Sequence, residues 1–410
     1  MERSQDVVVL GGGIAGAALA TVLARQGIQV AMLDRDLAPV DRVRGEYAPP
    51  WGVAELERLG LLDCLLKAGG IFAVRNIPYD EDNPGDAALP LARDLSKVLP
   101  GIAGSFCMSH PAMCSVLAQE ALKHGAVFLR GVEDIVLQPG TPPMVRFRHE
   151  QRERTWHARL VIGADGRNSQ ARRMAGIPLV SDRPHHLIGG MLVEGVPEWP
   201  QDTQVIGNEG NVFFLMFPQL GDRVRLYLCY DRADRGLYQG EDRRQKVLQA
   251  FGALRCLPHA AAIARSRPVG PFNAFSNEDH WCDDPRAPGV VLIGDAAGYN
   301  DPISGQGLSL AFRDVRLVGE AIAAGRRDPA GFEDYVLERR ERMRRLRIAA
   351  RLVSTLRAEF GPSARRRRQV VARRVAVDGM LSPGLATLLG PERLPAEAFE
   401  QNTIDALLAP

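Results

Sequence analysis

The stretch DVVVLGGGIAG, residues 6–16, decides the fold of this 410-residue chain. Its first five residues, from Asp6 to Leu10, form a short β-branched run, which is typical of a buried parallel strand. The rest matches G-x-G-x-x-G and leads into residues 14–26, whose Ala- and Leu-rich composition predicts a helix that ends at Gly27. Residues 29–33 predict a second strand that leads to Asp34. This order of strand, glycine-rich turn, helix, strand and acid predicts a dinucleotide-binding unit.

The glycines of this unit have separate tasks. Gly11 permits the tight turn, Gly13 lets the backbone approach a pyrophosphate, and Gly16 lets the helix pack closely on the strand. Because the helix begins at Ile14 and Ala15, its free N–H groups and the positive end of its dipole face the phosphates. The glycine pattern therefore predicts where the phosphates of the dinucleotide bind.

The acid after the second strand completes the unit. Asp34 lies 21 residues after Gly13, close to the spacing at which a carboxylate meets a ribose hydroxyl, and Arg35 follows it. This unit alone does not distinguish FAD from NAD(P). That distinction comes from two later segments.

The first of these segments is GADGRNS, residues 163–169, which follows the apolar run 160–162. The second is GDAAG, residues 294–298, which follows the apolar run 289–293. Both patterns place an acid, Asp165 or Asp295, at the carboxyl end of a parallel strand, where ligands of open α/β sheets bind.

A glycine-rich helix start follows the second segment. After Pro302 comes GQGL, residues 305–308, which opens a segment containing Ala and Leu. The free N–H groups of such a helix start suit the electron-rich N1–C2 carbonyl edge of a reduced flavin. The two later segments therefore favour FAD.

In their order and spacing, the three segments resemble the motifs of the class A flavoprotein monooxygenases, the p-hydroxybenzoate hydroxylase-like superfamily of FAD-dependent aromatic hydroxylases. The resemblance spans residues 6 to about 315. It implies an α/β fold with a Rossmann-like FAD-binding domain, an inserted antiparallel-sheet substrate domain and a C-terminal helical region. It also implies a function: hydroxylation or epoxidation of an aromatic or polycyclic small molecule through a flavin C4a-hydroperoxide, with NADPH or NADH as reductant and O2 as oxidant.

The resemblance also implies roles for individual residues. Asp34 would bind the adenosine ribose, Asp295 the ribityl chain, and Asp165 would support the flavin. Arg44 would reach the flavin or its phosphates, and the segment from Pro302 would flank the isoalloxazine. The expected cofactor-binding residues are Gly11, Gly13, Ile14, Ala15, Gly16, Asp34, Arg35, Arg44, His110, Asp165, Gly294, Asp295, Pro302, Gly305, Gln306, Gly307 and Leu308.

The chain departs from the family pattern at two positions. His110 stands where the family usually carries an arginine, and it lacks the guanidinium fork. Gly298 stands where a histidine often follows Gly-Asp-Ala-Ala. The first departure puts one expected flavin contact in question.

The remaining segments predict the domain organisation. Residues 187–194, 211–217 and 224–230 predict antiparallel strands that roof the flavin, with Phe213, Leu215 and Phe217 as candidate substrate contacts. The predicted divisions are 1–77, 101–182 and 283–330 for the FAD-binding domain, 78–100 and 183–282 for the substrate domain, and 331–410 for the C-terminal helices.

In this family the flavin performs the chemistry, so the sequence needs no catalytic triad or metal cluster. A base that deprotonates a phenolic substrate would help, and His185, His186, Tyr227 and Tyr230 are the candidates. Of these, His186 and Tyr227 are retained, although a structural role is the simpler interpretation of each.

Two alternatives stay open. Residues 213–218, FFLMFP, keep only the Phe-Pro of the Tyr-x-Trp-x-Phe-Pro segment of prenyl reductases, so reduction of a carbon–carbon double bond is one alternative. A non-catalytic FAD-binding partner protein is the other. A halogenase is disfavoured because no two of the four tryptophans are two residues apart, as Trp-x-Trp-x-Ile-Pro requires.

The charge is unevenly distributed. The whole chain carries a formal net charge of +2, whereas residues 339–374 contain 14 arginines against two glutamates. A solvated helical face explains this most simply, and a docking surface for an acidic carrier protein is the sharper hypothesis. Nucleic acid is not expected as a partner, because the flavin motifs already account for the fold.

Cysteine usage and hydropathy indicate a compartment. The six cysteines form no Cys-x-x-Cys pair and fit neither a zinc site nor a disulfide framework, which favours reduced thiols in a cytoplasmic enzyme. The apolar run 7–24 is interrupted by Gly11 to Gly13, so no transmembrane segment is expected.

Overall fold

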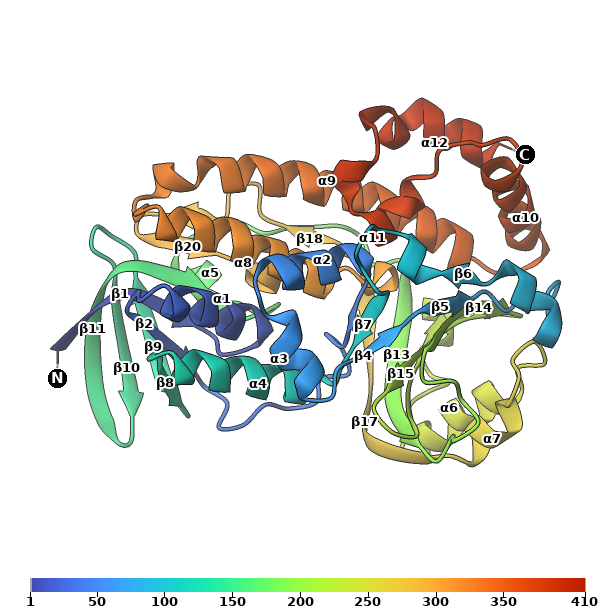
Figure 1. Ribbon diagram of the computed structural model, residues 1–410, viewed down its shortest axis with the longest axis horizontal. Coiled ribbons are helices and arrows are strands. Elements are labelled where there is room, and N and C mark those ends of the chain that lie inside the picture. The colour runs from blue at the N-terminus through green and yellow to red at the C-terminus, as the bar shows by residue number, and fades with distance from the viewer. Residues whose placement is uncertain (1, 410) are drawn as a thin grey trace.

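The computed structural model describes residues 2–409, and it contains two large sheets joined by a long helix (Figure 1). The first sheet lies near the N-terminus, on the left of Figure 1, and the second lies on the right. The helix α9 (Glu333–Arg357) runs along the top of the view from the first sheet toward the second.

The first sheet has a parallel centre. Its strands run in the order β19-β20-β11-β1-β2-β8, and β10 and β9 extend it from β11. The parallel strands are β20 (Val290–Leu292), β11 (Arg152–Gly163), β1 (Glu2–Leu10), β2 (Val30–Asp34) and β8 (Val127–Arg130). The antiparallel ones are β19 (Arg286–Ala287), β10 (Met144–His149) and β9 (Glu133–Gln138).

Both faces of β1 are buried, which explains its continuous apolar run. Val7 and Val9 pack in one core with the helices α1 (Ile14–Arg25), α4 (His110–Lys123) and α8 (Gly307–Ala323). Val8 and Leu10 pack in another core with residues of β9, β10 and β11. A strand that is covered on both sides has no polar face to present.

The predicted order of strand, helix and strand at the N-terminus is confirmed. β1 begins four residues earlier than predicted because residues 2–5 continue the parallel pairing with β11. The helix α1 ends at Arg25, one residue before the predicted end, and β2 lies one residue later than predicted.

The second sheet is mainly antiparallel, with the order β17-β13-β16-β15-β14-β5-β6. Its three predicted strands are confirmed, and the structure adds four strands that the sequence analysis did not identify. The three predicted strands are β13 (His186–Glu194), β15 (Val212–Gln219) and β16 (Arg223–Tyr230). The four others are β17 (Arg267–Asn277), β14 (Thr203–Glu209), β5 (Arg75–Ile77) and β6 (Arg93–Asp94).

The two faces of the second sheet have different neighbours. One face packs against α6 (Arg243–Gly252) and α7 (Ala260–Arg265), where Phe214 and Met216 meet Phe251. The opposite face carries Phe213, Leu215 and Phe217. The strand β5 pairs with β14, so the chain enters this sheet a few residues before the predicted boundary at residue 77.

The C-terminal region is helical, as predicted. After α9 come α10 (Pro362–Ala376), α11 (Ala386–Leu389) and α12 (Gln401–Leu408). The fold class predicted from the sequence, an α/β protein with an inserted antiparallel sheet and C-terminal helices, is therefore confirmed.

The basic segment is not uniformly a solvated face. Arg339 and Arg342 are buried, and both pair with Asp314 of α8. The exposed arginines of this segment are Arg340, Arg351, Arg366 and Arg373. The interpretation as a solvated face is correct for these four and wrong for the buried pair, because α9 packs against α8 there.

The sequence predicts no transmembrane segment and no disulfide framework. Across residues 2–409, none of the helices combines the length and the apolar character that crossing a bilayer requires. The six cysteines are free thiols, and five of them are buried.

Candidate functional site

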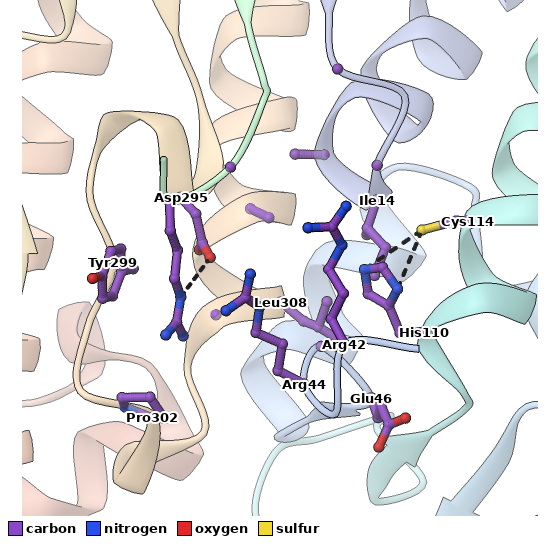
Figure 2. Close-up of a pocket in the computed structure, with 18 of the residues that line it drawn as sticks. Ile14, Arg42, Arg44, Glu46, His110, Cys114, Asp295, Tyr299, Pro302 and Leu308 are labelled. Carbon is purple, nitrogen blue, oxygen red and sulfur yellow. Dashed lines mark hydrogen bonds and ion pairs between the residues drawn. The ribbon is translucent and has the colours of Figure 1, made fainter. Parts of the chain in front are cut away.

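A cavity of about 710 Å³ lies between the two sheets. Its walls include the glycine-rich turn after β1, the two acid-bearing turns after β11 and β20, and the inner face of the second sheet. Figure 2 shows Asp295 and Tyr299 on one side, His110 and Cys114 on the other, and Arg44 between them. The topology thus brings three sequence motifs, separated by well over 100 residues, into one space.

The backbone of the glycine-rich turn explains its glycines. Gly11 has a φ of +105°, and a Cβ there would lie 2.5 Å from the carbonyl oxygen of Ala164. A Cβ on Gly16 would collide with the carbonyl of Gly11, so the helix could not pack on the turn. A Cβ on Gly13 would meet no protein atom within 4 Å. Gly13 therefore faces open space, as close approach to a pyrophosphate requires.

Asp34 is held at the end of β2 by backbone groups. Its Oδ2 accepts a hydrogen bond from the N–H of Gly12 at 2.6 Å, and its Oδ1 accepts one from the N–H of Asp36 at 2.8 Å. The carboxylate lines the cavity beside Ile14 and Ala15. Arg35 also lines it, with a largely exposed side chain 3.6 Å from Asp36.

Asp165 has a second task beside lining the cavity. Its Oδ1 accepts from the hydroxyl of Ser169, and its Oδ2 accepts from the N–H groups of Gln170 at 2.6 Å and Ala171 at 3.0 Å. These groups start the short helix α5 (Gln170–Met174). Because α5 uses both oxygens, the carboxylate is fixed in position.

Asp295 is paired with an arginine that the sequence analysis did not select. Nε of Arg167 donates to Oδ2 of Asp295 at 3.3 Å, and the same guanidinium lies 4.2 Å above the ring of Tyr299. Arg167 belongs to the Asp-Gly-Arg motif, so its place in that motif could have identified it from the sequence. Hydrogen bonds from buried Arg339 hold the turn that carries Asp295. Arg339 donates to the carbonyls of Gly294 at 3.2 Å and Gly298 at 2.9 Å.

Positive charge is concentrated at the middle of the cavity. Arg44 lines it together with Arg42 and Arg167. Burial and the neighbouring Arg167 lower the pKa of Arg44 to about 10, so it stays charged at neutral pH. Asp36 accepts from Arg42, but Arg44 has no carboxylate at ion-pair distance within residues 2–409. A cluster of this kind suits an anionic ligand.

His110 occupies the first turn of α4 and lines the cavity. Burial, and then Arg42 and Arg44, lower its pKa to about 4, so the imidazole is neutral at neutral pH. Its Nε2 lies 3.7 Å from Sγ of Cys114. A neutral imidazole donates one hydrogen bond, so His110 does not replace the arginine expected here in either charge or geometry.

The loop before α8 brings its backbone to the cavity. Gly305 has a φ of +67°, which turns the chain from Pro302 into the start of α8 at Gly307. The side chain of Gln306 is used elsewhere, since its Oε1 accepts from the indole of Trp51 at 2.8 Å. The residues Pro302, Gly305, Gln306, Gly307 and Leu308 all line the cavity.

The three candidate substrate residues also line the cavity. Phe213, Leu215 and Phe217 alternate along β15 and therefore share one face. The ring of Tyr47 lies 4.5 Å from that of Phe217, which extends the apolar wall. Of the expected cofactor-binding residues, Gly16 and Gly294 are not among the described residues that line the cavity.

The four candidate bases are not equivalent in the structure. Tyr227 lines the cavity, but its hydroxyl donates to the carbonyl of Val43 at 3.2 Å, and burial raises its pKa far above the usual value. His186 is buried 2.6 Å from the amide of Asn277, and burial lowers its pKa to about 3. His185, His186 and Tyr230 are not among the described lining residues.

A buried ion pair that the sequence analysis missed adjoins the site. Nη2 of Arg225, on β16, donates to Oε1 of Glu46 at 2.5 Å and to Oδ2 of Asp41 at 3.0 Å. Glu46 lines the cavity, and burial raises its pKa to about 7 although Arg225 opposes the shift. The sequence contained an indication of this ion pair, since Arg225 is a charged residue within a largely apolar strand, and the structure shows that its position is buried.

A second acidic cluster lies behind the loop of Pro302. Asp279 accepts from the amide of Asn300 at 2.5 Å and from the N–H of Asp301 at 2.8 Å. Asp301 in turn accepts from the hydroxyl of Ser354 at 3.2 Å. Burial raises the pKa of Asp279 to about 6 and that of Asp301 to about 7.

Known proteins resemble this chain along most of its length. The family model of an FAD binding domain matches residues 4–350. Rifampicin monooxygenase of Rhodococcus hoagii is 26% identical over 375 residues, which cover 88% of this chain and 74% of that protein. Squalene epoxidase 2 of Arabidopsis thaliana, a mitochondrial protein, is 27% identical over 325 residues, covering 77% and 53%. The chain thus spans about half the length of the squalene epoxidases that it matches.

Solved structures share the fold. The p-nitrophenol 4-monooxygenase PnpA of Pseudomonas putida DLL-E4 superposes with a TM-score of 0.79 at 18% identity, covering 99% of this chain and 98% of that one. Aklavinone-11 hydroxylase, solved with FAD and aklavinone, gives a TM-score of 0.71 at 21% identity, covering 87% and 71%. At these identities the likeness concerns the fold alone.

Proposed function

This chain belongs to the FAD-binding domain family, and on that premise we propose that it is an FAD-dependent monooxygenase. It would use NADPH or NADH and O2 to hydroxylate or epoxidise an aromatic or polycyclic small molecule. One observation carries this proposal: the three dinucleotide and flavin motifs line the same cavity as the apolar face of the second sheet. The monooxygenases among its sequence relatives support the same reaction class.

The residues present fit FAD. The open space at Gly13 and the carboxylate of Asp34 suit the pyrophosphate and the adenosine ribose. Asp295, held by Arg167, would bind the ribityl chain, and the free N–H groups at the start of α8 would face the flavin ring. Arg44 and Arg42 would balance the phosphate charge.

Bound FAD would supply the redox chemistry, because the reduced flavin activates O2, and O2 is the source of the oxygen atom that is transferred. The side chains of this chain orient the substrate and exclude water. Phe213, Leu215 and Phe217 form an apolar wall that keeps water from the reacting atoms. Tyr227 holds its proton through the neutral range, so its role is to position rather than to accept a proton.

We also propose a domain division, a cellular compartment and a surface for a partner. The two sheets support a division into FAD-binding, substrate and C-terminal parts, with the first boundary proposed before Arg75 in place of after residue 77. The free thiols support a reducing compartment such as the cytoplasm. An acidic carrier protein would have the exposed Arg340, Arg351, Arg366 and Arg373 to bind.

The decisive experiment is spectroscopic. The purified protein is loaded with FAD, and NADPH or NADH is added without oxygen while the visible flavin absorbance is followed. Bleaching, followed by O2 consumption and incorporation of one oxygen atom from 18O2 into a product, is the expected result. A colourless protein that takes up no FAD would overturn the proposal. Reduction of a substrate without O2 uptake would indicate the carbon–carbon double-bond reductase instead.

A further inference from the structure

One charged side chain stands in the apolar end of the cavity. The lining contributed by the second sheet and the C-terminal helices is apolar or aromatic, except for Thr387 and Arg357. Arg357 is the last residue of α9, and Val353, one turn earlier, packs beside Phe213 and Leu215. Among the described lining residues that the second sheet and the C-terminal helices contribute, Arg357 is the one charged residue.

The position of Arg357 is fixed by a single asparagine. Nη1 of Arg357 donates to Oδ1 of Asn208 at 3.1 Å, and Nδ2 of Asn208 donates to the carbonyl of Arg357 at 2.8 Å. Asn208 lies on β14 and is 1% exposed. Because both ends of the amide bind the same residue, the guanidinium is anchored to the second sheet.

The charge of Arg357 is not balanced by a carboxylate. In residues 2–409 no acidic oxygen lies at ion-pair distance from it, and no protein acceptor binds its Nε or Nη2. Burial lowers the pKa of Arg357, and nearby Arg368 lowers it further, whereas Asp80 opposes them. An enclosed cation without a partner is costly, so a cation kept in a cavity signals an anionic ligand.

The free edge of the guanidinium defines the ligand. With Nη1 occupied by Asn208, the Nε and Nη2 hydrogens form a planar pair that matches the two oxygens of a carboxylate. We propose that Arg357 binds the carboxylate of the substrate, and that the substrate class is aromatic or polycyclic carboxylic acids. This inference rests on the proposed function, and it adds the chemical group that the cavity recognises.

The test compares acids with their neutral amides. The FAD-loaded protein is titrated at pH 7.5 and 0.15 M salt with benzoate and benzamide, 2-naphthoate and 2-naphthamide, and pyrene-1-carboxylate and its amide. Flavin absorbance or calorimetry reports binding. At least one acid is expected to bind tenfold or more tightly than its amide, since a charge-assisted bidentate pair replaces a neutral contact.

The variants separate recognition from stability. Arg357→Gln should bring the acid and amide affinities within about twofold of each other, while Arg357→Lys keeps the charge and part of the preference. Arg351→Gln is the matched control, because Arg351 lies exposed on the same helix and its loss changes the net charge equally. It should retain the full preference. Melting temperature and FAD content show whether each variant is folded.

Two results would overturn the inference. One is an unmodified protein that prefers none of the three acids over its amide, and the other is an Arg357→Lys or Arg357→Gln protein with an unchanged preference. NAD(P)H-dependent bleaching is measured on the same samples. Normal bleaching without an acid preference would contradict this inference alone, whereas failure to bind FAD would remove the proposed function as well.

Discussion

Nη2 of Arg225 lies 2.5 Å from Oε1 of Glu46, and the two side chains are 0% and 3% exposed. Glu46 follows the first βαβ unit, and Arg225 lies on β16 of the second sheet. The ion pair therefore crosses between the two sheets at the wall of the cavity. Burying both charges is acceptable only while they remain paired.

Replacing Arg225 by methionine should destabilise the protein. Arg225→Met leaves the Glu46 carboxyl buried without its cation, and the loss of unfolding free energy should be about 3–5 kcal/mol. Chemical denaturation measures it. Arg223→Met, an exposed position on the same strand, should lose less than about 1 kcal/mol. Adding Glu46→Gln to Arg225→Met should recover part of the stability, and no recovery would contradict this account.

The buried Asp301 should make stability depend on pH. Its folded pKa is raised from 3.8 to about 7, so the folded state holds a proton that the unfolded state releases. The contribution of Asp301 to the free energy of unfolding is therefore fully present below pH 3.8, and it is lost as the pH rises to about 7. Asp301→Asn should therefore narrow the difference in melting temperature between pH 5 and pH 8 by a few degrees. Asp283→Asn, at an exposed site, should leave that difference unchanged.

Alanine substitutions at Gly13 and Gly11 should affect different properties, FAD affinity in the first case and stability in the second. Gly13→Ala places a methyl group in open space, so the apoprotein should melt normally while FAD affinity falls tenfold or more. Gly11→Ala forces a side chain into a φ of +105° and against the Ala164 carbonyl, and should cost the apoprotein about 1–3 kcal/mol. Calorimetry of the apoproteins and FAD titration distinguish the two. Unchanged FAD affinity in Gly13→Ala would place the pyrophosphate elsewhere.

Replacing a buried arginine of α9 should lower the stability of the protein more than replacing an exposed arginine of the same helix. Arg339→Met removes one of the two cations that pair with Asp314, together with the donors to the Gly294 and Gly298 carbonyls. It should cost about 3–5 kcal/mol and weaken FAD binding. Arg351→Met, on the exposed side of the same helix, should change stability by less than about 0.5 kcal/mol. Equal effects of the two substitutions would refute the distinction.

The elements predicted correctly depend on local patterns. The turn after β1 is encoded by adjacent glycines, and the cavity face of β15 by the alternation of Phe213, Leu215 and Phe217. The ion pairs depend on contacts between distant segments. Fourteen arginines in 36 residues look alike in a charge count, although Arg339 is enclosed and Arg351 is exposed. What distinguishes them is the packing of α9 on α8.

The strand order also determines when this protein can fold. β1 pairs with β11, and β11 with β20, so the parallel centre brings together residues near positions 5, 160 and 290. During synthesis, β11 has no β20 to pair with until residues 290–292 have left the ribosome. Most of the second sheet, which precedes these residues in the chain, must emerge before them. Folding of the cofactor half is thus a late event of translation, and until then its apolar strands are exposed to chaperones.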